Sequence, residues 1–361
     1  MADFSQFPTN ALKPLYCTFS YLPYPTSSLS SLNGMATLKL DPEFATVLAS
    51  LRGPQGPPPT FTDALSLRSM INTNLGALCS TVAYPGGVQE TNHIVTSLDG
   101  SSIGVTRFLP ESTQEAMATA NPQRAVVFVV GGGMIGGSVE VARNVIARNA
   151  QASETQFFGV EYRKAPEHRF PAAVEDVFST VVWLQDNTTT FNVDPARIIL
   201  YGPSAGGGVA AGAVLMARDK GLNPPVAGQV LKYPMIDDRT TISENSPLFP
   251  HLLWTPARND MGWKAYLGKE RGERTEDNVS PYAAPARVKD LGGLPATYII
   301  TGGLDLFRDE SATYAARLAA ANVPVEFHLY PGLPHAFDMA APNITATKHV
   351  DASLCKFIAE I

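Results

Sequence analysis

From about residue 88 onward, short apolar segments alternate with helical patterns, and this alternation constrains the fold more than any other feature of the chain. The run AVVFVV at 125–130 is apolar throughout, as is typical of a strand buried on both faces of a parallel sheet. The strand-like segments are VQETNHIVTSL, IGVTRFLP, AVVFVV, FFGVEY, RIILYG, GQVLKYP, ATYIITG and VEFHLYPG. Helical patterns such as AAVEDVFSTVVWLQ, SATYAARLAAA and ATKHVDASLCKFIAEI lie between or after them. This order predicts an α/β fold with a mainly parallel eight-stranded sheet and helices on both faces.

The N-terminal region, residues 1–85, does not follow this alternation. Its first 35 residues are rich in Pro, Ser and Tyr and are expected to form an extended arm. A helix is predicted over 41–51, with Asp41 as N-cap and Pro42 in the first helical position. The Pro-rich stretch GPQGPPP separates it from a second predicted helix that starts near Thr62. Helices outside a sheet are available to cover one end of it.

We therefore expect one unit over residues 1–361, with a core made by 86–235 and 276–361. The polar, Trp-containing stretch 236–275 interrupts the alternation between two strands and is predicted to be an insertion over one end of the sheet. Together with the helices of 1–85, it would form a cap.

Composition excludes several classes of function. The 361 residues have a formal net charge of −6 and no basic stripe, so nucleic acid is not an expected partner. The three cysteines, Cys17, Cys79 and Cys355, are far apart and show no metal-binding or disulfide pattern, which favours a reducing compartment. The N-terminus lacks secretory-signal features, and no apolar run reaches the length of a membrane span. We expect a cytoplasmic protein without metal or cofactor.

The motif Gly202-Pro203-Ser204-Ala205-Gly206 lies between a predicted strand, RIILY, and a predicted helix, AGGGVAAGAVLMA. In this setting a G-x-S-x-G sequence makes a sharp turn that holds the Ser hydroxyl out at the carboxyl edge of the sheet. The alternative is an ordinary Gly-rich turn with an N-capping Ser. The other parts of a reactive site, described next, favour a nucleophilic Ser204.

A nucleophilic serine needs a base, and a histidine in a loop at the same edge of the sheet can serve. His335 follows the strand VEFHLY directly, in PGLPHAF, and so meets this condition. His328 lies within that strand and His349 within the C-terminal helix, where neither is placed to act. His168, in YRKAPEHRFP, is the main rival, although its neighbours indicate a fixed loop.

The base needs a carboxylate to orient it. Asp305 follows the strand ATYIIT and is therefore at the same edge. Asp309 and Glu310 come one turn later, where we expect them to stabilise the start of the next helix. The resulting order Ser204, Asp305, His335 is that of α/β-hydrolases.

The glycine-rich segment VVGGGMIGGS follows the strand AVVFVV and has two interpretations. Its N–H groups can hold a developing oxyanion without side-chain obstruction. Alternatively, Gly131, Gly133 and Gly136 spell G-x-G-x-x-G, with Glu161 at the end of the next strand, as in dinucleotide-binding folds. That alternative leaves over a hundred preceding residues unexplained and gives Ser204, Asp305 and His335 no role.

These motifs resemble those of the hormone-sensitive lipase family of α/β-hydrolases, from about residue 88 to the C-terminus. The residues that carry the resemblance are GGGMIGGS, YRKAPEHRFPAAVED, DPARI, GPSAGG, LDLFRDE and HAF. The resemblance implies a carboxylesterase in which Ser204 is the nucleophile, Asp305 the orienting carboxylate and His335 the base. It also implies an oxyanion hole made by the N–H groups of Gly132, Gly133 and Ala205, a cap over the site, and frequent homodimerisation.

Two positions depart from the family pattern. Val130 stands where the family has His before the three glycines, and Pro203 stands where it has an acidic residue before the nucleophile. Both are expected to affect loop packing and substrate preference rather than the mechanism. The expected function is hydrolysis of small to medium acyl esters, a small-molecule substrate class. The alternatives are a lyase or cyclase of secondary metabolism, or a ligand-binding protein, on the same fold.

Overall fold

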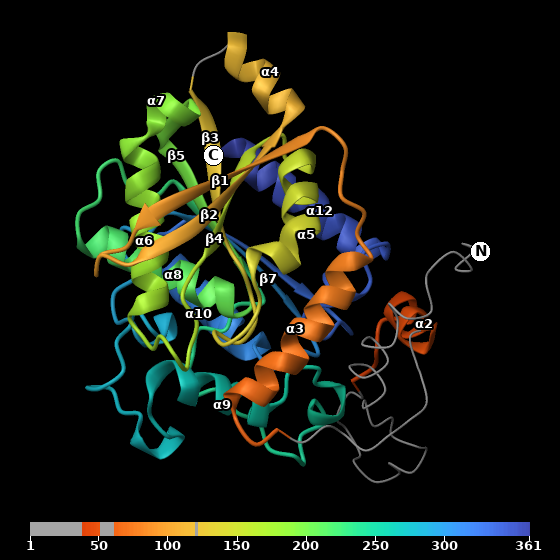
Figure 1. Cartoon of the computed structure of the whole chain (residues 1–361). Coiled ribbons are helices and arrows are strands. Elements are labelled where there is room, and N and C mark those ends of the chain that lie inside the picture. Colours follow the sequence, from red (N-terminus) through yellow and green to blue (C-terminus); the bar gives the residue numbers. More distant parts are fainter. Residues whose placement is uncertain (1–37, 51–60, 120–121) are drawn as a thin grey trace.

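The computed structural model describes residues 38–50, 61–119 and 122–361. The predicted arm and the Pro-rich stretch at 53–59 lie outside these residues. The described strands form one sheet of eight, and the prediction of an α/β-hydrolase fold is confirmed (Figure 1). Their bounds are β1 Val88–Thr96, β2 Ser102–Pro110, β3 Gln123–Val129, β4 Gln156–Glu161, β5 Val193–Pro203, β6 Gly228–Lys232, β7 Ala296–Gly302 and β8 Val325–Tyr330.

The strand order is β1-β2-β4-β3-β5-β6-β7-β8. β1 and β2 pair antiparallel with each other, β2 pairs antiparallel with β4, and every later pair is parallel. The chain leaves β3 toward β4 on one side and returns to β5 on the other. In an open α/β sheet, such a reversal opens a crevice beyond the carboxyl ends of the two strands, which is where ligands bind. The glycine-rich loop follows β3 and Ser204 follows β5, so both lie at this crevice.

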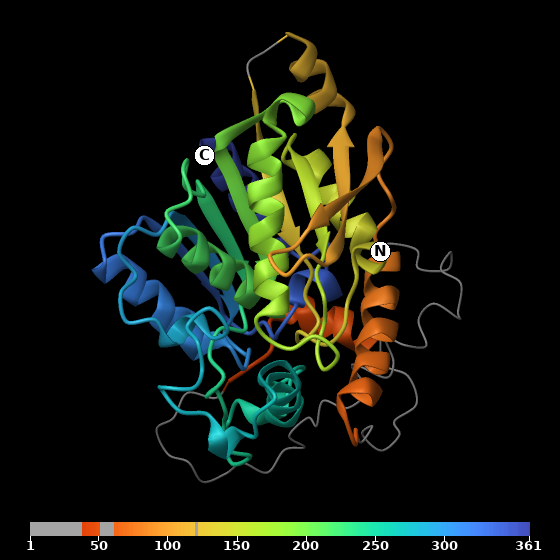
Figure 2. The ribbon, with the colours of Figure 1, turned by 60° about the vertical axis from the view of Figure 1, so that its left-hand side comes forward.

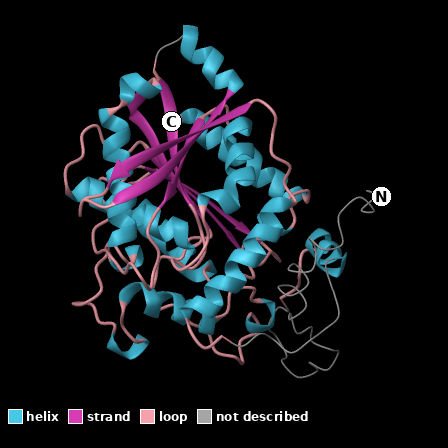
Figure 3. Ribbon diagram, viewed as in Figure 1, coloured by secondary structure: helices cyan, strands magenta, loops and turns pink. Residues whose placement is uncertain are grey.

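Helices cover both faces of the sheet, as Figures 2 and 3 show. The helices α6 and α8 pack on one face together with α10, whereas α5 and α12 lie on the other. The central strands are buried on both sides, and every residue from Ala125 to Val129 is at most 3% exposed. The bounds are α4 Glu111–Thr119, α5 Val139–Ala152, α6 Ala172–Asp186, α7 Thr188–Phe191, α8 Ala205–Asp219, α10 Arg308–Ala320, α11 Phe337–Ala340 and α12 Thr345–Glu360.

The two predicted N-terminal helices are present as α2, Pro42–Ser50, and α3, Ala64–Ser80. α3 begins with a capping box in which the Asp63 side chain accepts from the N–H of Ser66 at 2.7 Å. It runs from beyond the carboxyl edge of the sheet back alongside the core, and it packs against α5 and against α9, Pro256–Leu267 (Figure 1).

The stretch 236–275 contains a helix, α9, Pro256–Leu267, between two short 3₁₀ turns, Phe249–His251 and Arg271–Glu273. The local sequence explains α9, because Thr255 caps its start, Pro256 occupies the first turn, and Gly268 ends it with φ of 67°. A third 3₁₀ turn, Pro285–Arg287, follows the stretch. In both ribbon views α9 and the first turns of α3 lie together beyond the carboxyl edge of the sheet.

Candidate active site

Ser204 lies at a strained turn between β5 and α8. Its φ of 54° and ψ of −124° are unusual for a residue with a side chain, and such strain recurs at functional sites. Several backbone hydrogen bonds hold this turn in its conformation. The Ser204 N–H donates to the carbonyl of Lys232 at 2.8 Å, and the Ser204 carbonyl accepts from the N–H groups of Gly207, Gly208 and Met235.

The two glycines of the motif are needed because the backbone crosses itself here. A Cβ on Gly202 would lie 2.2 Å from the carbonyl of Gly206. A Cβ on Gly206 would lie 2.1 Å from the carbonyl oxygen of Val129, at the end of β3. The spacing of the motif therefore follows from packing that leaves no room for a side chain on either side of Ser204.

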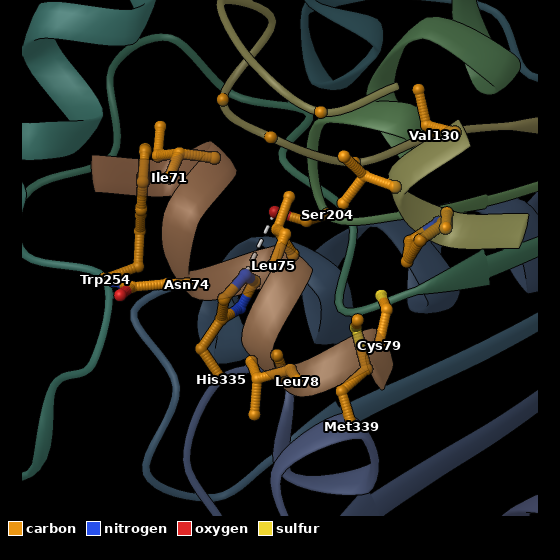
Figure 4. Close-up of a pocket in the computed structure, with 18 of the residues that line it drawn as sticks. Ile71, Asn74, Leu75, Leu78, Cys79, Val130, Ser204, Trp254, His335 and Met339 are labelled. Atoms are coloured by element: carbon orange, nitrogen blue, oxygen red, sulfur yellow. Dashed lines mark hydrogen bonds between the residues drawn. The ribbon is translucent and has the colours of Figure 1, made fainter. Parts of the chain in front are cut away.

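The structure brings Ser204, His335 and Asp305 together in one hydrogen-bonded chain. His335 Nδ1 lies 2.8 Å from Asp305 Oδ2. His335 Nε2 lies 2.9 Å from Ser204 Oγ, and Figure 4 shows this second contact. The carboxylate accepts from Nδ1–H, which leaves Nε2 free to accept from the Ser204 hydroxyl. The three residues come from the loops after β5, β7 and β8, as predicted from their positions after strands.

The base and its carboxylate are held firmly. Asp305 is fully buried, and its second oxygen accepts from the N–H of Phe307 at 2.9 Å. The rings of Tyr233 and Phe307 lie edge-on to the imidazole of His335, with centroids 4.9 and 5.2 Å away. The His335 side chain is 10% exposed, so it has little freedom to turn away from Ser204.

His168, the rival base, is exposed on the loop after β4 and does not line the cavity at Ser204. His328 is bonded to Glu326 within β8, and His349 is exposed on α12. Of the predicted candidates, His335 alone is within hydrogen-bonding distance of Ser204.

The glycine-rich loop after β3 turns tightly beside Ser204. The carbonyl of Gly132 accepts from the N–H groups of Ile135 and Gly136, and Gly132 and Gly133 have φ of 132° and 63°. Among the described residues, the N–H groups of Gly132, Gly133 and Ala205 have no hydrogen-bond acceptor. Three unpaired donors next to a nucleophile suit the stabilisation of an oxyanion.

The helix α3 anchors this loop, a role that the sequence did not predict. Asn72 Oδ1 accepts from the N–H of Gly137 at 2.8 Å, and the Arg68 guanidinium donates to the carbonyl of Ile135. Arg68 also pairs with Glu167 in the loop after β4. The cap helix thus contributes to the shape of the oxyanion loop as well as covering it.

The dinucleotide-binding interpretation of this loop finds no support. Glu161, which would have to bind a ribose, is already engaged: its carboxylate accepts from the N–H of Val139 at the start of α5 and pairs with Lys164. The loop itself folds back on its own backbone, since a Cβ on Gly137 would lie 2.1 Å from the carbonyl oxygen of Gly131.

The two departures from the family pattern are both part of the cavity wall. Val130 is 2% exposed, and its carbonyl accepts from the Tyr162 hydroxyl at 3.0 Å. The carbonyl oxygen of Pro203 would lie 2.8 Å from a Cβ on Gly131, so the loop passes directly over Pro203. An apolar side chain at each position makes the wall less polar than a histidine and a carboxylate would.

A buried ion pair supports the segment that carries His335. Asp338, in α11, pairs with Lys232 at the end of β6 and accepts from the Tyr233 hydroxyl at 2.7 Å. Burial alone would raise the pKa of Asp338, but the Lys232 ammonium and these hydrogen bonds hold it below its usual value. Burial alone would likewise lower the pKa of Lys232, and the Asp338 carboxylate keeps it above its usual range. Both groups therefore stay charged.

Glu310 lies in the first turn of α10, as predicted, and it also binds to the 236–275 stretch, which we did not predict. Its carboxylate is buried and accepts from the N–H groups of Ile236 and Asp237 and from the Thr240 hydroxyl. Burial raises the pKa of Glu310 well above its usual value, and these hydrogen bonds offset only part of the rise. Glu310 fixes the start of the 236–275 stretch to the core. Asp309 is exposed and pairs with Arg308.

A cavity of about 160 Å³ opens in front of Ser204. Its walls are mostly apolar. α3 contributes Ile71, Leu75 and Leu78, α11 contributes Met339, and the 236–275 stretch contributes Trp254 (Figure 4). Cys79 also lines it, but burial raises the pKa of this thiol to about 12, so it stays protonated and does not compete with Ser204 as a nucleophile.

Comparison with known proteins agrees with this geometry. Residues 126–339, more than half of the chain, match the family described as having the alpha/beta hydrolase fold. The chain belongs to this family. The resemblance to its hormone-sensitive lipase members, on which the prediction of a carboxylesterase-like chain rested, is confirmed.

Several relatives are esterases by name. Esterase LipI of Mycobacterium tuberculosis is 33% identical over 212 residues, which cover 59% of this chain and 65% of LipI. An arylesterase of Saccharolobus solfataricus is 33% identical over 57% of this chain and 66% of its own length. The chain thus spans slightly less than two thirds of these curated relatives. A bacterial heroin esterase structure superimposes with a TM-score of 0.76 at 32% identity, covering 89% of this chain and 97% of that one.

Some contributors to the site carried no obvious sequence signal. Asn72 and Arg68 bind the glycine-rich loop after β3, which is distant in sequence, so their role becomes visible only in the folded structure. One signal was present in α3, where the polar Asn74 interrupts the apolar positions Leu67, Ile71 and Leu78 at helical spacing.

Within the described ranges, no helix is long and apolar enough to cross a membrane.

Proposed function

We propose that this protein hydrolyses carboxylic esters through an acyl-enzyme on Ser204. The observation that carries the proposal is the chain of hydrogen bonds from Asp305 through His335 to Ser204, which ends at the floor of an apolar cavity. The esterases among its relatives support the same reaction. The match covers slightly less than two thirds of the length of LipI and of the arylesterase, so the activity of the whole protein is part of this proposal.

In the proposed mechanism, His335 Nε2 takes the Ser204 proton while Ser204 Oγ attacks the ester carbonyl carbon. The N–H groups of Gly132, Gly133 and Ala205 hold the resulting oxyanion. His335 then gives its proton to the departing alcohol, and a water molecule, activated by the same imidazole, hydrolyses the acyl-enzyme. Asp305 keeps the imidazole in the required tautomer and stabilises its charged form.

We propose a cap made by α2, α3 and the stretch 236–275 over a core of 86–235 and 276–361. The support is that α3 and Trp254 both line the cavity. A cavity of about 160 Å³ is close to the roughly 150 Å³ that holds a benzene ring in an engineered protein core. This size favours small to medium acyl esters. A cytoplasmic location, indicated by cysteine usage, and homodimerisation, implied by the family, stay predictions.

The alternatives are disfavoured by the intact hydrogen-bonded chain. A ligand-binding protein on this fold needs neither a base nor its orienting carboxylate, and a lyase or cyclase needs no serine nucleophile activated by them.

The test is to incubate the protein with short-chain p-nitrophenyl esters and with a fluorophosphonate probe, beside Ser204→Ala and His335→Ala variants. We expect turnover and labelling in the wild type and neither in Ser204→Ala. Absence of both in the wild type contradicts the esterase proposal. Full activity in Ser204→Ala shows another nucleophile, and full activity in His335→Ala moves the base role elsewhere.

A further inference from the structure

The cavity in front of Ser204 contains one cationic side chain that the proposed reaction does not use. Arg258, on α9, lines this cavity, and no Asp or Glu is among the described residues that line it. The remaining walls are almost entirely apolar. A cation facing such a space without a carboxylate needs an explanation, because a charge removed from water is usually paired.

Arg258 has few partners of its own. One guanidinium nitrogen, Nη1, donates to the carbonyl of Leu253 at 2.8 Å, and the ring of Phe61 lies 5.6 Å from the guanidinium carbon. In the described part of the chain, Nε and Nη2 have no hydrogen-bond acceptor, and no carboxylate lies within ion-pairing distance. Burial lowers the pKa of Arg258, which is the expected effect when no anion compensates the loss of water. An arginine is nevertheless charged at any pH at which the protein folds.

Asn74 is a second underused polar group on the same wall. It is 8% exposed and lies on the face of α3 that carries Ile71 and Leu78 into the cavity (Figure 4). Its amide nitrogen contacts only the sulfur of Met70, which is a weak acceptor. Its carboxamide oxygen has no donor among the residues that the structure describes. Buried polar groups are normally satisfied, so this amide has capacity left for a ligand.

Both groups belong to the cap side of the cavity. Asn74 is on α3 and Arg258 is on α9, and these two helices pack against each other. Ser204 and His335 come from the opposite, core side. A ligand whose carbonyl lies at Ser204 therefore has these donors on the cap side of the same cavity. Arginine and amide N–H groups together are suited to the oxygens of a carboxylate.

We propose that the preferred substrate is an ester that carries a carboxylate group, bound at the cap side by Arg258 and Asn74. This inference rests on the proposed esterase activity and specifies its substrate class. It runs against the overall electrostatics, since a chain with net charge −6 repels anions. A preference for an anionic ester therefore has to come from a local cation, and Arg258 supplies it.

The experiment compares kcat/KM for esters that differ only in the carboxylate. In one series, p-nitrophenyl half-esters of dicarboxylic acids of increasing length are compared with counterparts in which a neutral carboxamide replaces the carboxylate, which places the carboxylate on the acyl side. In the other, acetate esters of ω-hydroxy acids are compared with those of the corresponding ω-hydroxy carboxamides, which places it on the alcohol side. We expect the free carboxylate to be favoured about tenfold or more at one chain length in one series.

Variants assign the preference to its residues. Arg258→Gln is expected to lower the ratio of the two kcat/KM values tenfold to a hundredfold, and Arg258→Lys to retain most of it. Asn74→Leu is expected to lower the ratio by a smaller factor. The matched control is Lys264→Gln, which removes an exposed cation of α9 that pairs with Glu270 outside the cavity and should leave the ratio at its wild-type value.

The outcomes separate this inference from the proposed function. If the wild type hydrolyses the neutral esters at least as well as the carboxylates at every length in both series, the substrate class is wrong while the esterase activity stands. An unchanged ratio in Arg258→Gln also overturns it. If no ester of either kind is hydrolysed, the proposed function itself fails.

Discussion

The contact between Gly133 and Trp254 offers a sharp test of how the cap and the oxyanion loop depend on each other. A Cβ on Gly133 would lie 2.8 Å from Cη2 and 3.1 Å from Cζ2 of the Trp254 ring. In addition, the φ of 63° at Gly133 costs an L-residue roughly 1–2 kcal/mol. The indole is itself held, because its Nε1–H donates to Asn259 Oδ1 at 3.3 Å. In Gly133→Ala, the loop is therefore expected to move away from Ser204.

Displacement of one oxyanion donor costs about 3–4 kcal/mol of transition-state stabilisation, so we expect kcat of Gly133→Ala to fall roughly 10²- to 10³-fold. The assay is steady-state hydrolysis of p-nitrophenyl butyrate, with circular dichroism to confirm folding. The matched control is Gly76→Ala in α3, where nothing lies within 4 Å of an added Cβ. That change should retain activity and stabilise the helix by up to about 1 kcal/mol.

A double-variant cycle identifies the cause. If the Trp254 ring displaces the loop, Gly133→Ala combined with Trp254→Ala regains part of the kcat that Gly133→Ala loses, measured relative to Trp254→Ala alone. The reasoning is refuted if Gly133→Ala keeps kcat within threefold of wild type. An equal loss of kcat in both backgrounds would assign the effect to backbone strain at Gly133 and not to contact with Trp254.

Three further predictions concern the groups that hold the site together. Asp338→Asn removes the charge that pairs with buried Lys232 and is expected to lower the free energy of unfolding by about 3–5 kcal/mol at pH 7. Because the pKa of Asp338 is depressed, this loss of stability should shrink below about pH 4. A difference between wild type and variant in urea melts that does not change with pH would contradict this prediction. The pKa of Glu310 is raised, so the folded state holds its proton more tightly than the unfolded state, and the free energy of unfolding falls as pH rises from about 4.3. The free energy of unfolding of Glu310→Gln should therefore increase relative to wild type as pH is raised from 4 to 8. Parallel curves of stability against pH for the two proteins would argue against a buried carboxyl. Asn72→Ala removes the acceptor of the Gly137 N–H and is expected to lower kcat about fivefold, equivalent to about 1 kcal/mol, with wild-type kcat as the contrary result.

The sheet and the reactive residues could be predicted because their causes are local. A parallel strand buried on both faces is apolar along its whole length, and the segments at 125–130 and 198–201 show this directly. Ser204, Asp305 and His335 each follow such a strand, and the carboxyl ends of parallel strands meet at one edge. Position after a strand was therefore sufficient to bring together side chains separated by up to 131 residues in sequence.

The helices α5 and α9 were not predicted, although local signals for both exist. Ser138 caps α5, and Thr255 with Pro256 starts α9. Both helices carry many polar residues, so the overall hydrophobicity of each segment is low. The end signals were more informative than hydrophobicity in these two segments.

A cap made of the N-terminal helices and the 236–275 stretch was predicted, but the cap side chains that face the cavity could not be, because they meet only through tertiary packing. Nothing near Arg258 or Asn74 in the sequence indicates that α9 and α3 face one cavity. Glu310 illustrates the same limit, because its place in the first turn of α10 was predicted but its hydrogen bonds to the stretch that begins at Ile236 were not. Electrostatic roles that depend on burial need the fold.

Trapping the acyl-enzyme tests most directly whether Ser204 is the nucleophile. The protein is mixed with excess p-nitrophenyl ester, quenched in acid at early times, and examined by intact-mass and peptide mass spectrometry. If Ser204 is the nucleophile, we expect a rapid release of p-nitrophenol together with an added mass of one acyl group on the peptide that contains Ser204, and no such adduct in Ser204→Ala. Turnover without any covalent adduct, or an adduct on a different residue, would contradict it.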